Sequence, residues 1–151
     1  MARSIGVFGA GPGLGQAVAR RYAQEGYEIV LVGRRWKPLD AFAQALIVAG
    51  ASAHAITADL SETEAVPALA EHIRAAVGDL DAIYYAPTPE DGFVPAAGLT
   101  PQRAQAFMPL VFYSLLALVQ QFLPHMVEQA VAGRSRSAGL LTRLSNPRAH
   151  L

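Results

Sequence analysis

The most constraining feature of the sequence is a glycine-rich stretch between the apolar run at residues 5–8 and a helical pattern that begins at Gln16. Glycines in such a turn permit left-handed backbone, let a bound diphosphate approach bare main chain, and bring the following helix close to a sheet. The first turn of that helix presents unpaired N–H groups to an anion. The stretch therefore predicts an α/β fold whose first strand-to-helix turn binds phosphate, and the alternative is a loop without a ligand. Its glycines are Gly9, Gly11, Gly13 and Gly15.

Strand and helix patterns alternate along the rest of the chain. Branched and apolar runs predict strands at 27–32, 51–57 and 80–86, and helical spacing predicts helices at 36–49, 61–77 and 101–126. With right-handed crossovers these units form a three-layer sandwich whose parallel sheet has the order 3-2-1-4, with 138–145 as a candidate fifth strand. A capping box predicts a helix start at Ser61, and Pro109 predicts a kink in the last helix.

Composition narrows the classes of partner. The 151 residues are 52% hydrophobic and 16% charged with zero net charge, so we expect neither nucleic acid nor a membrane as a partner. The longest apolar run, Leu110 to Val119, is shorter than a membrane span. The chain has no cysteine and its four histidines show no ligand spacing, so we expect no metal site and a cytoplasmic location.

The phase of the glycines carries a family resemblance. The order G-x-G-x-x-G does not fit, because Leu14 stands where its last glycine belongs. Gly9, Gly13 and Gly15 instead fit G-x-x-x-G-x-G, which resembles the short-chain dehydrogenase/reductase family. The resemblance covers residues 4–130 and implies a Rossmann-type domain over 1–130, with the cofactor diphosphate over Gly11, Pro12, Gly13 and Leu14.

Two arginines follow the second predicted strand. NAD-binding Rossmann domains place an acidic residue here, roughly twenty residues past the glycines, to bond the ribose 2′-hydroxyl. This chain has Gly33 at that position, followed by Arg34 and Arg35. A guanidinium can hold a 2′-phosphate in two hydrogen bonds, so we predict NADP(H) rather than NAD(H). The alternative is a solvated arginine pair that opens the next helix.

The resemblance also assigns residues at the ends of the third and fourth strands. Asp59 and Leu60 match the family's acidic and apolar pair at the adenine ring, although Asp59 also suits a turn before a helix. Ala86 matches the alanine of the family's Asn-Asn-Ala-Gly, which is here the segment 84–87, Tyr-Tyr-Ala-Pro. Tyr84 and Tyr85 should point to opposite faces of their strand.

The family's catalytic residues are missing from this sequence. Its Tyr-x-x-x-Lys pair moves a proton to or from the substrate oxygen, and here the only lysine is Lys37. Val111 stands where the family's helix asparagine belongs, and Ser145 is a weak match for its serine. Residues 131–151 contain four arginines and no acidic residue, which indicates an altered or truncated C-terminal segment. We therefore assign no catalytic residue.

Two functional hypotheses remain. The first is an NADP(H)-dependent oxidoreductase of the short-chain family that is inactive as this chain stands. The second is a non-enzymatic NADP(H)-binding sensor or subunit that acts through protein contacts. The helix at 101–126 is apolar on more than one face, and in the family this helix packs against its copy in a partner subunit, so we expect a homo-oligomer. A third hypothesis, a structural fragment without a ligand, would require that the glycine spacing match the family pattern by chance.

Overall fold

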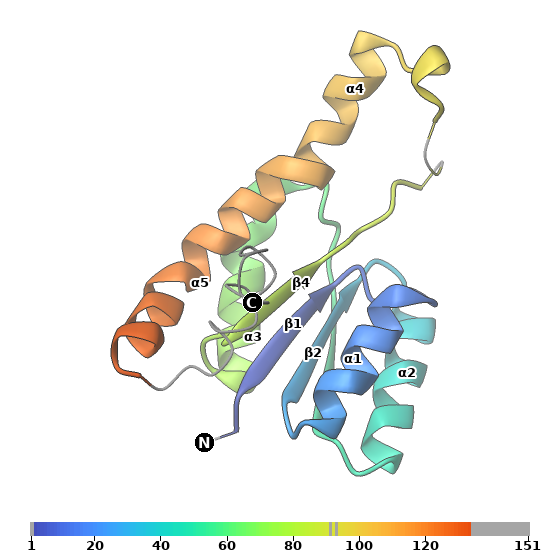
Figure 1. Ribbon diagram of the computed structural model, residues 1–151. Helices are drawn as coiled ribbons and strands as arrows, with labels where there is room; N and C mark the ends of the chain where they lie inside the picture. Colours follow the sequence, from blue (N-terminus) through green and yellow to red (C-terminus); the bar gives the residue numbers. More distant parts are fainter. Residues whose placement is uncertain (1, 91, 93, 134–151) are drawn as a thin grey trace, which may run out of the picture.

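A four-stranded parallel sheet forms the centre of the molecule. The computed structural model describes residues 2–90, 92 and 94–133 (Figure 1). Within them the sheet has the order β3-β2-β1-β4, as the sequence predicted, and the candidate fifth strand lies outside the described residues. Phe8 of β1 lies opposite both Val32 of β2 and Tyr85 of β4, so these strands end together at one carboxyl edge. The strands are β1 (Ser4–Phe8), β2 (Glu28–Gly33), β3 (Ala53–Thr57) and β4 (Ala82–Tyr85).

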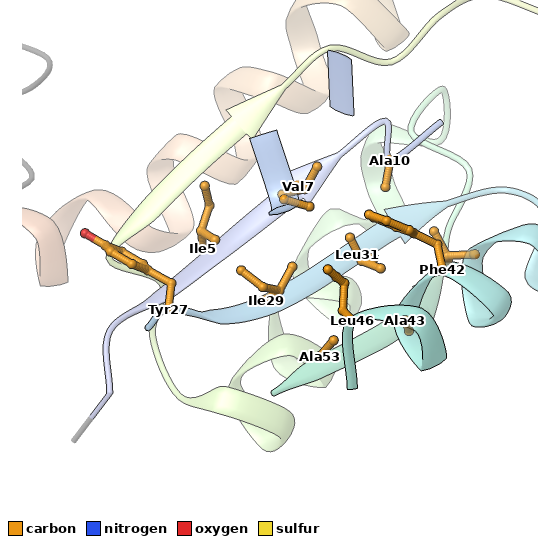
Figure 2. Close-up of a cluster of buried hydrophobic side chains, with 12 residues drawn as sticks. Ile5, Val7, Ala10, Tyr27, Ile29, Leu31, Phe42, Ala43, Leu46 and Ala53 are labelled. Atoms are coloured by element: carbon orange, nitrogen blue, oxygen red, sulfur yellow. The ribbon is translucent and has the colours of Figure 1, made fainter. Parts of the chain in front are cut away.

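Helices cover both faces of the sheet, which confirms the predicted three layers. One face packs against α1 (Leu14–Gln24) and α2 (Trp36–Val48), and the other against α3 (Val66–Val77) and α5 (Ser114–Val131) (Figure 1). Figure 2 shows the first core, in which side chains of β1 and β2 lie on the same side of the sheet as Phe42 of α2.

Alternation along the strands divides the side chains between these two cores. Ile29 and Leu31 of β2 join the core under α1 and α2, whereas Val30 and Val32 join the core under α3 and α5, and all four are fully buried. A strand that is buried on both faces reads as a continuous apolar run. Tyr84 packs against the first core and Tyr85 against the second, so the prediction that they face opposite ways is confirmed.

The predicted start of α3 is wrong. The α-helix begins at Val66, after a 3-10 turn, η1 (Thr63–Ala65), and no side chain caps it. The Asp59 carboxylate explains the difference, because its Oδ1 accepts hydrogen bonds from the Ser61 main-chain N–H at 2.9 Å and from the Ser61 hydroxyl at 2.6 Å. The Ser61 hydroxyl is therefore engaged in this local turn and does not cap the helix as the predicted capping box required.

The long C-terminal helix is continuous but changes its winding. After a short 3-10 turn, η2 (Ala96–Gly98), comes α4 (Pro101–Met108). Its N-cap is Thr100, whose hydroxyl accepts from the Arg103 N–H at 3.2 Å. A π-helical turn, η3 (Pro109–Tyr113), then connects α4 to α5. At Pro109, where the sequence predicted a kink, the helix forms one wider, π-helical turn. Figure 1 shows α4 extending beyond the carboxyl edge of the sheet.

The predicted end of this helix near Met126 is wrong, because α5 continues through Pro124 to Val131. The proposed domain boundary after residue 130 falls in its last turn. By length and composition, the 31-residue helix Pro101–Val131 is the one helix in the described part of the chain that could cross a membrane. Leu118 and Phe122 of α5 are fully buried in the core beside the sheet, as expected of a sheet-covering helix. The absence of a membrane partner stays a prediction.

Candidate cofactor site

A pocket of about 280 Å³ lies at the carboxyl edge of the sheet. It is bounded by the glycine-rich turn, the connection from β2 to α2, the segments that follow β3 and β4, and η3. In parallel α/β sheets, ligands bind outside the carboxyl ends of the strands. Several predicted site residues line this pocket, namely Gly9, Gly11, Pro12, Arg34, Arg35 and Leu60.

Two glycines of the turn are required by packing within the protein. Gly9 has φ +91°, and a Cβ there would lie 2.5 Å from the Ala86 carbonyl oxygen. A Cβ on Gly15 would lie 2.5 Å from the Gly9 carbonyl oxygen, where α1 approaches the end of β1. The Gly9 N–H donates to the Val32 carbonyl at 3.0 Å, which fixes the turn against β2. Ala86 therefore contacts the turn through its main chain, although it does not line the pocket.

The other two glycines have open space around them. A Cβ on Gly11 or on Gly13 would meet nothing within 4 Å. Gly13 has φ +101°, so its backbone conformation accounts for the glycine. Gly11 has neither a left-handed φ nor a close neighbour, so nothing in the described chain requires glycine there. A ligand that approaches the main chain at Gly11 would supply the reason.

The N-terminus of α1 is suited to an anion. Gly13 is its N-cap and has no side chain to satisfy the first N–H groups of the helix. The first turn of α1, all of it within the described residues, contains no acidic side chain. Leu14, the first residue of the helix, is 69% exposed. The helix end therefore offers free donors and a partial positive charge beside the pocket.

Arg34 and Arg35 line the same pocket where β2 passes into α2. Arg34 follows Gly33, the last residue of β2, and Arg35 is the N-cap of α2. Among the described residues that line the pocket there are two arginines and no acidic residue. The Arg34 side chain is 42% exposed, and its Nη1 lies 3.0 Å from Oε1 of Glu90 in the loop after β4. The two guanidinium groups can therefore bind an anion, although Glu90 already pairs with one of them.

Asp59 does not line the pocket, although Ala58 and Leu60 on either side of it do. Hydrogen bonds from Ser61, aided by the positive charge of Arg34, lower the pKa of the Asp59 carboxyl. Its Oδ1 is thus held in a turn, as the alternative interpretation proposed. The adenine contact assigned to Asp59 stays a prediction, and Leu60, which is 4% exposed, is the better placed of the pair.

Nine of the residues that line the pocket were not assigned to the site from the sequence, among them Gln16, Thr88 and Leu110. Gln16 stands in the first turn of α1 directly after the glycines, and that position was a usable signal. Thr88 comes from the loop after β4, and Leu110 comes from η3 of the long helix. Their presence depends on how the loop after β4 leads into the helix, and no local pattern encodes that path.

A sequence family and several solved structures match this chain. A family model described as short chain dehydrogenase matches residues 3–134. An uncharacterized oxidoreductase of Mycobacterium tuberculosis is 38% identical over 77 residues, which are 51% of this chain and 29% of that protein. Serine 3-dehydrogenase of Agrobacterium fabrum is 27% identical over 150 residues, which are 99% of this chain and 56% of that protein. The chain therefore spans about half or less of the length of these curated relatives.

Solved structures share the fold over most of this chain. The 3-oxoacyl (acyl-carrier-protein) reductase of Agrobacterium tumefaciens, solved with NADP bound, has a TM-score of 0.74 and 27% identity over 84% of this chain and 48% of that one. A metagenomic short-chain oxidoreductase in complex with NADP has a TM-score of 0.70 and 26% identity over 83% of this chain and 57% of that one. The glycine phase, the strand order and these matches agree. The chain belongs to the short-chain dehydrogenase family.

Proposed function

We propose that this chain binds a nicotinamide dinucleotide along the carboxyl edge of its sheet and prefers NADP(H) to NAD(H). The diphosphate lies over Gly11 to Leu14, and the 2′-phosphate meets Arg34 and Arg35. The observation that carries the proposal is that the open glycine turn and both arginines border one pocket, whose described lining contains no acidic residue. A carboxylate there would repel a 2′-phosphate, whereas a guanidinium binds it. Two solved relatives above 25% identity hold NADP, which supports this class of cofactor.

We further propose that this 151-residue chain does not catalyse a redox reaction by itself. A bound NADP(H) would supply or accept hydride, but a carbonyl reduction also needs a positioned acid. The sequence has no Tyr-x-x-x-Lys pair, and its only lysine, Lys37, lies in the first turn of α2. The hydroxyl of Tyr85 donates to the main-chain carbonyl of Leu110 and so is already engaged. Among the described residues we therefore assign no acid to this step.

An exposed apolar stripe favours the second hypothesis, a binding subunit that acts through protein contacts. Phe112, Leu116, Leu123 and Val127 follow one side of the long helix and are 48%, 44%, 47% and 51% exposed. No Asp, Glu, Lys or Arg occurs from residue 104 to residue 127. Large exposed apolar patches mark contact surfaces. We infer that two copies of the chain associate through this stripe.

Direct titration tests the cofactor assignment. The intrinsic fluorescence of NADPH and NADH should report saturable binding of each to the purified chain, with NADPH bound more tightly. A folded protein that binds neither would refute the assignment. Equal affinities for the two cofactors would refute the preference for NADP(H) and leave the general site in place.

A further inference from the structure

The arginine assigned to the 2′-phosphate already has an anionic partner within the chain. Nη1 of Arg34 lies 3.0 Å from Oε1 of Glu90. Arg34 follows β2, whereas Glu90 lies in the loop after β4, and β1 separates these two strands in the sheet. The contact therefore crosses the carboxyl edge. Pro87 and Thr88, just before Glu90, line the same pocket as Arg34.

A carboxylate and a phosphate make the same kind of contact with a guanidinium. Both accept charge-assisted hydrogen bonds from its N–H groups, so they compete when one guanidinium must serve both. The other nearby carboxylate, Asp59, has its Oδ1 bonded to Ser61. Within the part of the chain that the structure describes, Arg35 has no carboxylate partner. An incoming 2′-phosphate can thus engage Arg35 while Glu90 still holds Arg34.

We propose that Glu90 is a specificity-determining residue, an internal carboxylate that competes with the cofactor's 2′-phosphate for Arg34. The proposal rests on the NADP(H) site proposed above. NAD(H) carries no 2′-phosphate and does not have to displace Glu90. The Glu90 carboxylate therefore lowers the affinity for NADP(H) and leaves the affinity for NAD(H) unchanged. It reduces the difference in affinity between the two cofactors that the arginines create.

The size of the effect follows from the exposure of the pair. The side chains of Arg34 and Glu90 are 42% and 82% exposed, and exposed ion pairs of this kind are weak. Removing the competitor should therefore tighten NADP(H) binding by about two- to fivefold. Because Glu90 is so exposed, its replacement should not disturb the fold.

Glu90→Gln removes the charge and keeps the size of the side chain. NADPH should bind this variant about two- to fivefold more tightly than the parent, and NADH should bind both equally. Glu25→Gln is the matched control, because Glu25 pairs with Arg21 at 2.6 Å on the surface of α1 and does not line the pocket. It removes the same charge and should change neither affinity.

A double-mutant cycle then separates competition at Arg34 from a general change of charge. In an Arg34→Ala background, Glu90→Gln should leave NADPH affinity unchanged. A gain that persists without Arg34 overturns the proposal, as does a parent that binds NADPH and gains nothing from Glu90→Gln. These two outcomes leave the cofactor site itself standing. A folded parent that binds neither cofactor overturns the proposed function and this inference together.

Discussion

The hydroxyl of Tyr85, at the end of β4, donates a hydrogen bond to the main-chain carbonyl of Leu110 in the π-helical turn η3. Leu110 also lines the pocket, so this bond fixes one wall of the candidate site to the sheet. Burial raises the pKa of the Tyr85 hydroxyl to about 12. At neutral pH the group therefore stays a neutral donor.

Tyr85→Phe should destabilise the chain. The variant keeps the ring in the core but leaves the Leu110 carbonyl without this donor, which costs about 1 kcal/mol in the free energy of unfolding. Urea unfolding of parent and variant measures the difference. An unchanged free energy of unfolding would mean that the hydrogen bond contributes nothing to stability.

The same tyrosine predicts a pH dependence. Its folded pKa of about 12 lies above the ordinary value of 10.0, so between these two pH values the unfolded chain gives up the proton that the folded chain keeps. The contribution of Tyr85 is therefore fully present below pH 10 and is lost as the pH rises toward 12. Parent and Tyr85→Phe should converge in stability over this range, and curves that stay parallel would contradict the assignment.

Gly11→Val tests the diphosphate position without straining the fold. A Cβ at Gly11 meets no atom within 4 Å, whereas Gly13 has φ +101° and any side chain there would be strained. The valine should weaken NADPH binding by roughly tenfold or more, because it fills the space through which the diphosphate reaches the main chain. Gly98→Ala, outside the pocket, is the control and should bind NADPH like the parent. If Gly11→Val is folded and binds normally, the diphosphate lies elsewhere.

The stripe on the long helix should make the chain associate. Light scattering at several concentrations should give the mass of a dimer, and Leu116→Lys should weaken this association at least roughly tenfold by placing a charge in the apolar contact. Ile47→Lys is the control, since Ile47 on α2 has the same 44% exposure as Leu116. A parent that stays monomeric would refute the proposed contact. A parent that stays in solution only with detergent, beside a Leu116→Lys variant that needs none, would instead point to a membrane as the partner of the parent.

The chain should not oxidise NADPH in the presence of aldehydes or ketones. The sequence has no Tyr-x-x-x-Lys pair to act as the acid, and the Tyr85 hydroxyl donates to the Leu110 carbonyl. Absorbance of NADPH followed over a panel of carbonyl substrates should stay at the rate without enzyme. A rate above that background, removed by Gly11→Val, would show that an unrecognised acid serves the site.

Sequence reasoning succeeded where the signals are local. The strand order follows from apolar runs that alternate with helices and from the preference for right-handed crossovers. The Arg pair after β2 and the glycine turn meet at one pocket because the carboxyl ends of neighbouring parallel strands lie at one edge. Both could be placed from position along the chain alone.

Structure could not be predicted from the sequence where two groups compete for one hydrogen-bonding partner, or where the path of a loop decides which side chains meet. Asp59 and the predicted capping box both needed Ser61, and the sequence does not say which of them prevails. Pro124 removes one helical N–H, but the burial of Phe122 holds the helix against the core and α5 continues. The contact from Glu90 to Arg34 depends on the path of a loop after β4, for which no periodicity exists.

The most direct test of the proposed preference for NADP(H) compares the affinities of two cofactors for one variant. Arg34→Ala removes the proposed ligand of the 2′-phosphate, and a charge-assisted contact of this kind corresponds to roughly ten- to hundredfold in affinity. NADPH should therefore bind this variant that much more weakly than the parent, while NADH affinity stays the same and Arg21→Ala, a surface control on α1, alters neither. Equal losses for NADPH and NADH would show that Arg34 supports the fold rather than the phosphate, and would contradict the account.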